Sequence, residues 1–399
     1  MQKNTPSLRF PEFKGPWKEG RLGSIFNERN VKKQNKSFEM LSVTLSQGVV
    51  LQSGTIKKDT ASKNKSNYKI VRKNDIAYNT MRMWQGASGV SKYEGVVSPA
   101  YTVLTLKVGN INFFEYLFKL PRTIFDFYRY SQGLTSDTWN LKFDHFSEVA
   151  AVFPIEIAEQ QKIADFLSQV DSWLQNLKKQ KELYKKYKKG MVQKIFSQKI
   201  KFKDDKDNGF SNWESRKLDE VLLEHKQKST GKEEVFSVSV HKGLINQIEH
   251  LGRSFSAKNT DNYNLVKPFD VVYTKSPTGD FPLGIIKQSR VNKNVIVSPL
   301  YGVFTPETPG LGCMLNNYFE SPINTQNYLN SIVLKGAKNT INISNNTFLS
   351  KKLSLPVSKQ EQQKIAEFLT SLDKIIESKQ KQMDLAENWK KGLMQRMFI

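Results

Sequence analysis

A long basic segment occurs twice in the chain, and it constrains the fold more than any other feature. The first copy runs from Pro154 to Phe196 and the second from Pro356 to Phe398, so corresponding residues stand 202 positions apart. Both copies carry Glu-Gln-Gln-Lys-Ile-Ala near their start, and they align without a gap. Two such copies, each closing one half of the chain, predict a duplicated architecture.

Apolar side chains recur in both copies at alternating steps of three and four residues, which is typical of a coiled-coil helix. The predicted seam of the first copy contains Ile163, Phe166, Val170, Trp173, Leu177, Gln180, Tyr184, Tyr187 and Met191. That of the second copy contains Ile365, Phe368, Leu372, Ile375, Lys379, Gln382, Ala386, Trp389 and Leu393. Gln180 and Gln382 interrupt the seams at the same step, as register-fixing polar residues do. An ordinary amphipathic core helix is the alternative, and the gapless duplication argues against it.

The connection between the halves predicts how the two helices pack. A helix over residues 157–196 is about 60 Å long at a rise of about 1.5 Å per residue. The link from Phe196 to Trp213 spans at most about 56–61 Å when fully extended, so parallel packing would use nearly all of it. We therefore expect antiparallel packing, which needs almost none of this length and would place the two domains at opposite ends of the pair.

The regions in front of the long segments also correspond. Leu41–Thr44 matches Phe236–Ser239, and Val97–Tyr101 matches Val297–Tyr301. Their Val, Ile, Tyr and Thr residues, separated by Gly, Pro and Asn, predict short strands. Short helices are expected over 112–130 and 316–333, broken at Pro121 and Pro322.

The predicted fold class is therefore α+β. Two tandem pseudo-repeats each consist of a mixed α/β domain followed by a long helix, and the two helices form an antiparallel coiled coil. The expected boundaries are 1–153 for the first domain, 154–198 for the first helix, 199–355 for the linker and second domain, and 356–399 for the second helix.

The charge of the chain points to a polyanionic partner. Its 399 residues contain 61 Lys and Arg against 38 Asp and Glu, a formal net charge of +23. Such an excess favours nucleic acid first and an anionic membrane second. The single Cys313 excludes a disulfide scaffold. Neither a signal peptide nor an apolar run long enough to span a membrane is visible, so we expect a cytoplasmic protein.

The sequence lacks the motifs of the common catalytic sites. It has no phosphate-binding Gly-x-x-x-x-Gly-Lys-Ser/Thr loop and no glycine-rich loop paired with an Asn/Asp-Pro-Pro-aromatic motif, which an S-adenosylmethionine methyltransferase should carry. The four histidines have no Cys or His partners at metal-ligand spacing. We therefore predict no catalytic residue and no metal ligand in this chain.

What remains is recognition of DNA, which two corresponding loops could perform. The first contains Asn79, Arg82, Trp84 and Gln85, whose amide and guanidinium groups suit adenine and guanine edges. The second carries different side chains on the same frame, as a second half-site requires. Nearby lysines could neutralise phosphates. The candidate DNA-binding residues are Lys57, Lys58, Lys63, Lys65, Asn79, Arg82, Trp84, Gln85, Lys258, Lys275, Ser276, Thr278 and Asp280.

At this point the chain resembles the specificity subunit of a bacterial type I restriction–modification system. The resemblance rests on the lead-in Leu8-Arg9-Phe10-Pro11-Glu12-Phe13, the two Val-Ser-Pro-x-Tyr segments and, above all, the doubled Pro…Glu-Gln-Gln-Lys-Ile-Ala helices. It covers essentially the whole chain. One departure is that the family often has Gly before the Asp of the strand at 75 and 270, where this chain has Asn74 and Phe269.

The resemblance implies a non-catalytic, DNA-binding subunit for phage defence, with two target recognition domains that each read half of a split, asymmetric site. Its partners would be double-stranded DNA, two adenine-methylating subunits that use S-adenosylmethionine, and motor–nuclease subunits that use ATP and magnesium. The helices would dock the methyltransferase subunits. The residues proposed for the coiled coil and this docking are Ile163, Phe166, Val170, Trp173, Leu177, Gln180, Ile365, Phe368, Leu372, Ile375, Gln382 and Trp389.

Two other functions are weighed against this one. A self-sufficient restriction–methylation enzyme would be far longer and would carry the methyltransferase motifs that are missing here. A coiled-coil scaffold without DNA specificity would continue through many heptads rather than alternate with large domains. Salt-sensitive binding to DNA separates the specificity subunit from the scaffold, and methyl transfer by the isolated chain would support the enzyme.

Overall fold

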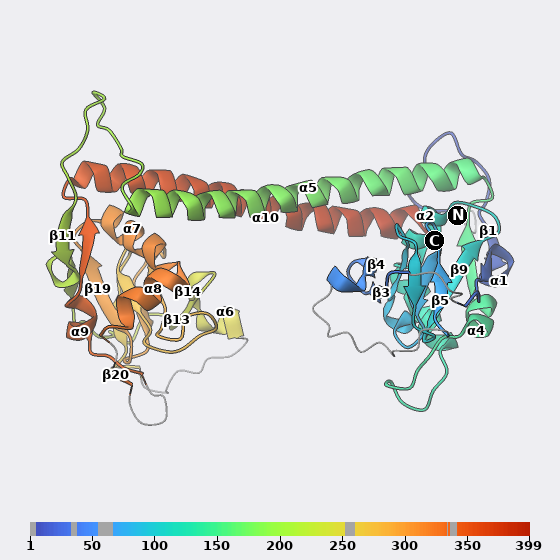
Figure 1. Cartoon of the computed structure of the whole chain (residues 1–399), viewed down its shortest axis with the longest axis horizontal. Coiled ribbons are helices and arrows are strands. Elements are labelled where there is room, and N and C mark those ends of the chain that lie inside the picture. The colour runs from blue at the N-terminus through green and yellow to red at the C-terminus, as the bar shows by residue number, and fades with distance from the viewer. Residues whose placement is uncertain (1–4, 33–37, 55–66, 252–259, 333, 336–340) are drawn as a thin grey trace. The chain divides into compact units, whose positions relative to one another are not determined.

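The computed structural model describes residues 5–32, 38–54, 67–251, 260–332, 334–335 and 341–399. Its contacts divide the chain into two compact units. Unit 1 comprises Met1–Lys178 and Lys381–Ile399, and unit 2 comprises Lys179–Gln380. Each unit therefore combines one variable region with the start of one long helix and the end of the other (Figure 1).

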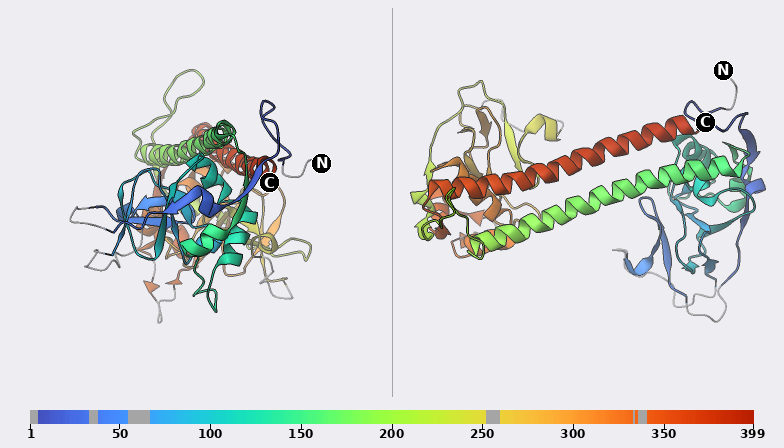
Figure 2. Two further views of the ribbon diagram at one scale, coloured as in Figure 1. Left: turned by 90° about the vertical axis from the view of Figure 1, so that its right-hand side faces the viewer. Right: turned by 90° about the horizontal axis from the view of Figure 1, so that it is seen from above.

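The two long helices are α5 (Ile157–Phe196) and α10 (Lys359–Met397). Within each unit they lie side by side and run in opposite directions (Figure 2). In unit 1, Lys390 of α10 pairs with Asp171 of α5. In unit 2, Lys181 bonds to Gln380 and Lys188 pairs with Asp373 at 2.6 Å. The residue numbers on α10 therefore decrease as those on α5 increase. The predicted antiparallel direction is confirmed in each unit.

The buried seam differs from the predicted one at every second step. Ile163, Val170 and Leu177 are buried as expected, whereas Trp173 is 46% exposed and Gln180 is also exposed. The side chains that close the seam stand one residue further along each helix. These buried or half-buried side chains are Leu167, Leu174, Lys181 and Lys188 in α5, and Leu369, Ile376, Met383 and Lys390 in α10.

Contacts outside the helix pair explain this shift. Leu167 belongs to one apolar core with Phe113 of α2 (Ile111–Leu117), and Leu369 packs with Met314 of α7 (Pro309–Phe319). Because the globular part of each unit covers one side of its helices, the buried face turns toward it. The prediction that Gln180 and Gln382 interrupt the seam is therefore wrong, since both are exposed. Buried Lys188 is a polar seam residue that can fix the register.

Unit 1 is built around a four-stranded antiparallel sheet with strand order β2-β9-β6-β7. Its strands are rich in β-branched and aromatic residues, which favour this conformation. Three two-stranded pairs, β3-β4, β5-β8 and β1-β10, accompany it. The strands are β1 (Lys18–Arg21), β2 (Phe26–Glu28), β3 (Leu41–Thr44), β4 (Gly48–Leu51), β5 (Lys69–Val71), β6 (Ile76–Asn79), β7 (Ser88–Val90), β8 (Gly95–Val97), β9 (Tyr101–Leu106) and β10 (Ala150–Phe153).

Unit 2 repeats this arrangement. Its four-stranded sheet has the order β12-β19-β16-β17, and β13-β14, β15-β18 and β11-β22 match the three pairs of unit 1. A further pair is β20-β21. The strands are β11 (Glu214–Lys217), β12 (Leu222–Glu224), β13 (Phe236–Ser239), β14 (Gly243–Asn246), β15 (Asn264–Val266), β16 (Val271–Tyr273), β17 (Ile286–Gln288), β18 (Val295–Val297), β19 (Gly302–Pro306), β20 (Leu334–Lys335), β21 (Ile341–Asn342) and β22 (Lys352–Leu355).

Short helices complete each unit, and proline starts several of them. Pro121 and Pro322 each occupy the first turn of the second helix of a pair, where a missing N–H is harmless. The predicted breaks at these two prolines are confirmed. The remaining short helices are α1 (Leu22–Ile25), α3 (Pro121–Tyr130), α4 (Phe143–Glu148), α6 (Gln247–Leu251), α8 (Pro322–Leu329), α9 (Asn345–Leu349) and the 3₁₀ turns η1 (Gln52–Gly54), η2 (Met83–Gln85) and η3 (Leu218–Glu220).

The predicted fold class, two tandem repeats of a mixed α/β domain and a long helix, is confirmed. The domain boundaries stay predictions, since the compact units divide both long helices instead of ending beside them. Over the described part of the chain, no helix is long and apolar enough to cross a membrane.

The turn before each central strand requires a left-handed residue. Asn74 has φ +70° and Phe269 has φ +69°, each directly before the Asp that precedes the central strand. Asn tolerates this conformation, but for a bulky residue it costs about 1–2 kcal/mol of conformational free energy. Half-exposed Phe269 is therefore strained in unit 2.

We expect Phe269→Asn to raise the free energy of unfolding by up to about 1 kcal/mol, because it relieves this backbone strain. The reverse exchange in unit 1, Asn74→Phe, should lower it by a similar amount. Chemical denaturation of the full chain measures both. Phe125→Asn, at an exposed position in α3, is the control and should give no gain. Destabilisation by Phe269→Asn would contradict the strain.

Candidate nucleic-acid interface

Three loops of unit 1 meet at one edge of the central sheet. They are the segment after β6 (79–86), the turn before β9 (98–100) and the segment after α3 (131–140). The Thr80 hydroxyl donates to the Ala100 carbonyl at 2.9 Å, and the Leu141 amide donates to the Thr80 carbonyl at 2.9 Å. A depression of about 380 Å³ lies between the loops, with Lys69 and Lys142 among its lining residues. We call this surface the reading edge of unit 1.

The predicted residues of the first loop divide into two groups. Asn79 and Trp84 hold the loop together, since the side-chain Oδ1 of Asn79 accepts from the Met81 amide and the Trp84 indole donates to the Met81 carbonyl, both at 3.0 Å. Arg82 is exposed and Gln85 is half-buried. Of the four, the Arg82 guanidinium is therefore the best placed to reach a base edge.

The corresponding loop of unit 2 lies between β16 and β17 and carries the other predicted residues. Thr278 and Phe281 exchange backbone hydrogen bonds at 3.0 and 2.9 Å, which makes the loop a tight hairpin. Ser276, Thr278 and Asp280 are exposed on it. Lys275 is half-buried, and burial lowers the pKa of its ammonium group. The two loops therefore present different chemistry on equivalent strands.

The duplicated Val-Ser-Pro-x-Tyr segments are turns that complete both edges. The Tyr101 amide donates to the Ser98 carbonyl at 3.0 Å, and the Tyr301 amide donates to the Ser298 carbonyl at 3.1 Å. Five predicted phosphate contacts lie outside the described residues, namely Lys57, Lys58, Lys63, Lys65 and Lys258.

A polar joint that the sequence analysis did not assign fastens each long helix to its unit. In unit 1, the Trp17 indole donates to buried Glu159 at 3.1 Å, and Arg9 forms two bonds to the same carboxylate at 2.7 and 2.8 Å. The signal that could have revealed the joint was the recurrence of Trp and Glu-Gln-Gln in both halves. Glu159 lies in the first turn of α5, where the helix dipole favours a negative charge.

The joint of unit 2 is incomplete. The Trp213 indole donates to Glu361 at 3.1 Å, but Lys201 stands where unit 1 has Arg9. Among the described residues, the second carboxylate oxygen of Glu361 is buried without a hydrogen-bond partner. Burial raises the pKa of this carboxyl group, and the indole hydrogen bond and the Lys201 charge oppose the rise.

The first glutamine of the repeated Glu-Gln-Gln motif closes the joint. Gln160 donates to the Pro154 carbonyl at 2.8 Å and accepts from the Asn110 amide at 2.8 Å. Gln362 donates to the Pro356 carbonyl at 2.9 Å and accepts from the Thr308 hydroxyl at 2.5 Å. Asn110 and Thr308 are the N-caps of α2 and α7. In both units this glutamine therefore links the start of the long helix to the start of a short helix.

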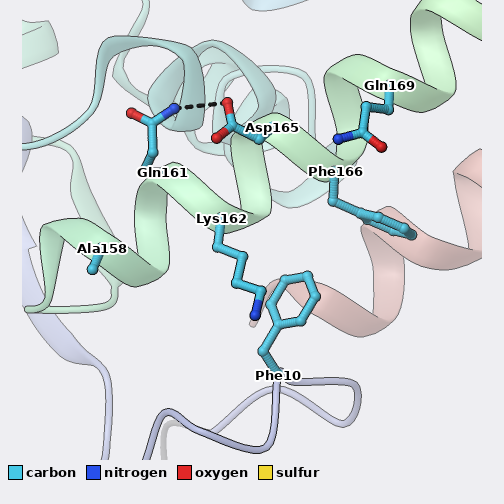
Figure 3. A pocket seen from close by; sticks show the side chains of 7 residues that line it. All are labelled: Phe10, Ala158, Gln161, Lys162, Asp165, Phe166 and Gln169. Carbon is cyan, nitrogen blue, oxygen red and sulfur yellow. Dashed lines mark hydrogen bonds between the residues drawn. The ribbon is translucent and has the colours of Figure 1, made fainter.

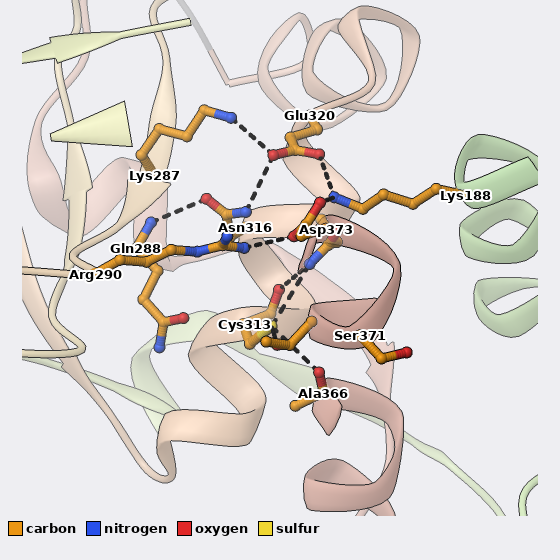
Figure 4. A network of polar contacts seen from close by, with 12 residues as sticks. Lys188, Lys287, Gln288, Arg290, Cys313, Asn316, Glu320, Ala366, Ser371 and Asp373 are labelled. Carbon is orange, nitrogen blue, oxygen red and sulfur yellow. Dashed lines mark hydrogen bonds and ion pairs between the residues drawn. The ribbon is translucent and has the colours of Figure 1, made fainter. Parts of the chain in front are cut away.

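A partly buried ion network joins the two long helices in unit 2 (Figure 4). Lys188 of α5 lies 3.1 Å from Glu320 and 2.6 Å from Asp373 of α10, while Lys287 also pairs with Glu320 at 2.9 Å and Arg290 with Asp373 at 2.7 Å. Burial would raise the pKa of Glu320, but the two ammonium groups lower it to about 2. The network ties both long helices to α7 and β17, so it positions the globular part of unit 2 on them.

The helix pair also exposes apolar surface in unit 1. A hollow of about 390 Å³ lies on the first turns of α5, and Phe10 and Phe166 line it (Figure 3). Their rings meet edge to face at 6.0 Å. Phe166 and Trp173 both contact Trp389 of α10, at 6.2 and 6.4 Å between ring centres. Trp173 is 46% and Trp389 49% exposed, so this aromatic cluster is open to a partner.

The other proposed docking residues vary in accessibility. Ile163, Val170, Leu177, Ile365 and Leu372 are buried, whereas Phe368 and Ile375 are half-buried and Gln382 is exposed. Within the described residues, no group of three or more His, Cys, Asp or Glu side chains could hold a metal ion.

Comparison with known proteins identifies what the chain is similar to. The family model for the type I restriction modification DNA specificity domain matches twice, over residues 14–185 and 210–387. The crystal structure of the type I restriction–modification S subunit from M. genitalium is similar over 99% of both chains, with 15% identity and a TM-score of 0.58. A structure described as explaining complex assembly and conformational transition of the type I restriction–modification system matches over 97% of this chain and 99% of that chain, with 12% identity and a TM-score of 0.52. No curated protein matches the chain.

The unequal joints predict opposite effects of one exchange. Lys201→Arg should raise the free energy of unfolding by about 1–2 kcal/mol, because a guanidinium can satisfy the free oxygen of Glu361. Arg9→Lys should lower it by a similar amount. Denaturation of the full chain measures both. Lys199→Arg, at an exposed neighbouring position, is the control. If Lys201→Arg changes the free energy of unfolding no more than this control does, a guanidinium at position 201 does not stabilise Glu361.

Proposed function

Because the chain belongs to the type I restriction modification DNA specificity domain family, we propose that it is the non-catalytic subunit that gives such a complex its DNA sequence specificity. The observation that carries the proposal is the duplication itself. Two units share a strand order and a pair of turns but carry different side chains on equivalent loops. The family match over both halves and the net charge of +23 support DNA as the ligand.

Each unit reads one half of a split, asymmetric site. In unit 1, exposed Arg82 suits a guanine edge, because a guanidinium bonds to O6 and N7 together. In unit 2, exposed Asp280 suits the amino group of cytosine, and Ser276 and Thr278 can bond to several bases. Asn79, Trp84, Gln85 and Lys275 support these loops or contact DNA beside them. The predicted lysines Lys57, Lys58, Lys63, Lys65 and Lys258 bind phosphates.

The chemistry belongs to partner subunits. Two adenine methyltransferase subunits carry S-adenosylmethionine, and motor–nuclease subunits use ATP and magnesium. The complex acts on DNA in the cytoplasm. The methyltransferase subunits dock on the long helices, and the exposed cluster of Phe166, Trp173 and Trp389 supports this assignment, since aromatic side chains are enriched at the centres of protein interfaces.

The first experiment maps adenine methylation in a genome with this chain expressed beside its methyltransferase subunit. We expect a split, asymmetric motif that appears only when the chain is present. Exchange of residues 1–153 for the corresponding region of a relative should change one half-site and leave the other. A continuous motif, or changes in both half-sites, would contradict the two-reader assignment, and methylation that is indifferent to the chain would refute the function.

Docking is tested by co-purification. We expect Trp173→Ser combined with Trp389→Ser to weaken binding of the methyltransferase subunit at least tenfold, because hot-spot aromatics typically contribute about 2 kcal/mol or more. Tyr93→Ser removes an exposed aromatic ring away from the helices and serves as the control. Unchanged affinity in the double variant would exclude the aromatic cluster from the interface while leaving DNA specificity intact.

A further inference from the structure

The segment between α3 and α4 of unit 1 is a preorganised hairpin. Gln132 and Asn140 exchange backbone hydrogen bonds at 2.9 and 2.8 Å, and the Thr138 amide donates to the Thr135 carbonyl at 2.9 Å. Gly133 has φ +149°, and a Cβ there would lie 2.7 Å from the Thr138 carbonyl. Only glycine fits this crossing, and the backbone bonds close the segment into a hairpin.

The tip of the hairpin presents exposed side chains to solvent. Leu134 is fully exposed, at 101% of its reference area, and Thr135, Ser136 and Asp137 are exposed beside it. Asp137 is the one charged residue between positions 131 and 140. Burial of a leucine side chain is favourable, and this exposed leucine makes no such contribution to folding. Contact with a bound ligand could bury it.

The hairpin belongs to the reading edge. Besides the bond from Leu141 to Thr80, the Trp139 ring lies edge to face on Trp84 at 5.2 Å and on Tyr128 at 4.9 Å. Thr138 and Asn140 line the same depression as Met81. The hairpin is therefore fixed beside the loop that carries Arg82.

The chemistry of the tip suits bases better than phosphates. A carboxylate is repelled by the DNA backbone, but it accepts a hydrogen bond from the cytosine N4 amino group in the major groove. Leucine methyl groups match the thymine C5 methyl group, which lies in the same groove. Threonine and serine hydroxyls bond to either donors or acceptors there.

We propose that the hairpin 131–140 is a base-reading element of unit 1, in which Asp137 and Leu134 contact base edges in the major groove of one half-site. This inference rests on the proposed function and deepens it. It adds a second reading loop to the one that carries Arg82, and it assigns that loop to cytosine and thymine contacts.

The test uses methylation mapping of the full chain with its methyltransferase subunit, for Asp137→Asn and Leu134→Ala separately. We expect Asp137→Asn to reduce discrimination about tenfold or more at one base position of one half-site, and Leu134→Ala to reduce it about fivefold at a neighbouring position. The other half-site stays unchanged. Both side chains are exposed, so neither exchange removes a core contact.

Matched controls lie at the opposite end of the same sheet. The controls are Glu94→Gln and Val108→Ala. Glu94 follows β7 and Val108 follows β9, at the ends of these strands that are remote from Asn79. Both should leave the motif unchanged. If the wild-type chain directs a split motif but both hairpin variants behave like the controls, the hairpin does not read bases and the function stands. If the wild-type chain directs no motif, the proposed function itself fails.

Discussion

A buried carboxylate in the first turn of each long helix is the interaction on which the rest of its unit depends. Glu159 receives the indole of Trp17 and Glu361 receives that of Trp213, so each lead-in segment is fastened to a helix start far away in the sequence. The helix dipole favours the charge at this position. Only in unit 1 does an arginine complete the pairing, which makes the two joints chemically unequal although their frame is repeated.

The repeated frame separates support from recognition. The strand order, the turns after Ser98 and Ser298 and the glutamine links from helix to helix are the same in both units. The loops at the end of the central strands differ, with Arg82 in one unit and Asp280 in the other. Because backbone bonds hold the loops, their exposed side chains can vary without cost to the core.

The helix seam shows how far a periodic pattern can be trusted. Adjacent apolar residues, such as Phe166 and Leu167, fit a heptad equally well in the sequence. The globular part of the unit decides between them, because it buries Leu167 and leaves Trp173 and Trp389 at the margin. The same contacts bring Lys188 into the seam, where Glu320 and Asp373 compensate its charge.

The sequence by itself determined the duplication, the long helices, their antiparallel direction and the α+β class, because repeats, heptads and linker length are properties of the chain alone. It could also identify the loop of Arg82, since that loop follows a recognisable strand. Only the tertiary structure decided the seam residues, the joints of Glu159 and Glu361, and the hairpin of Leu134 and Asp137 beside Thr80. These features join residues that are distant in sequence, and no local pattern records which of them meet.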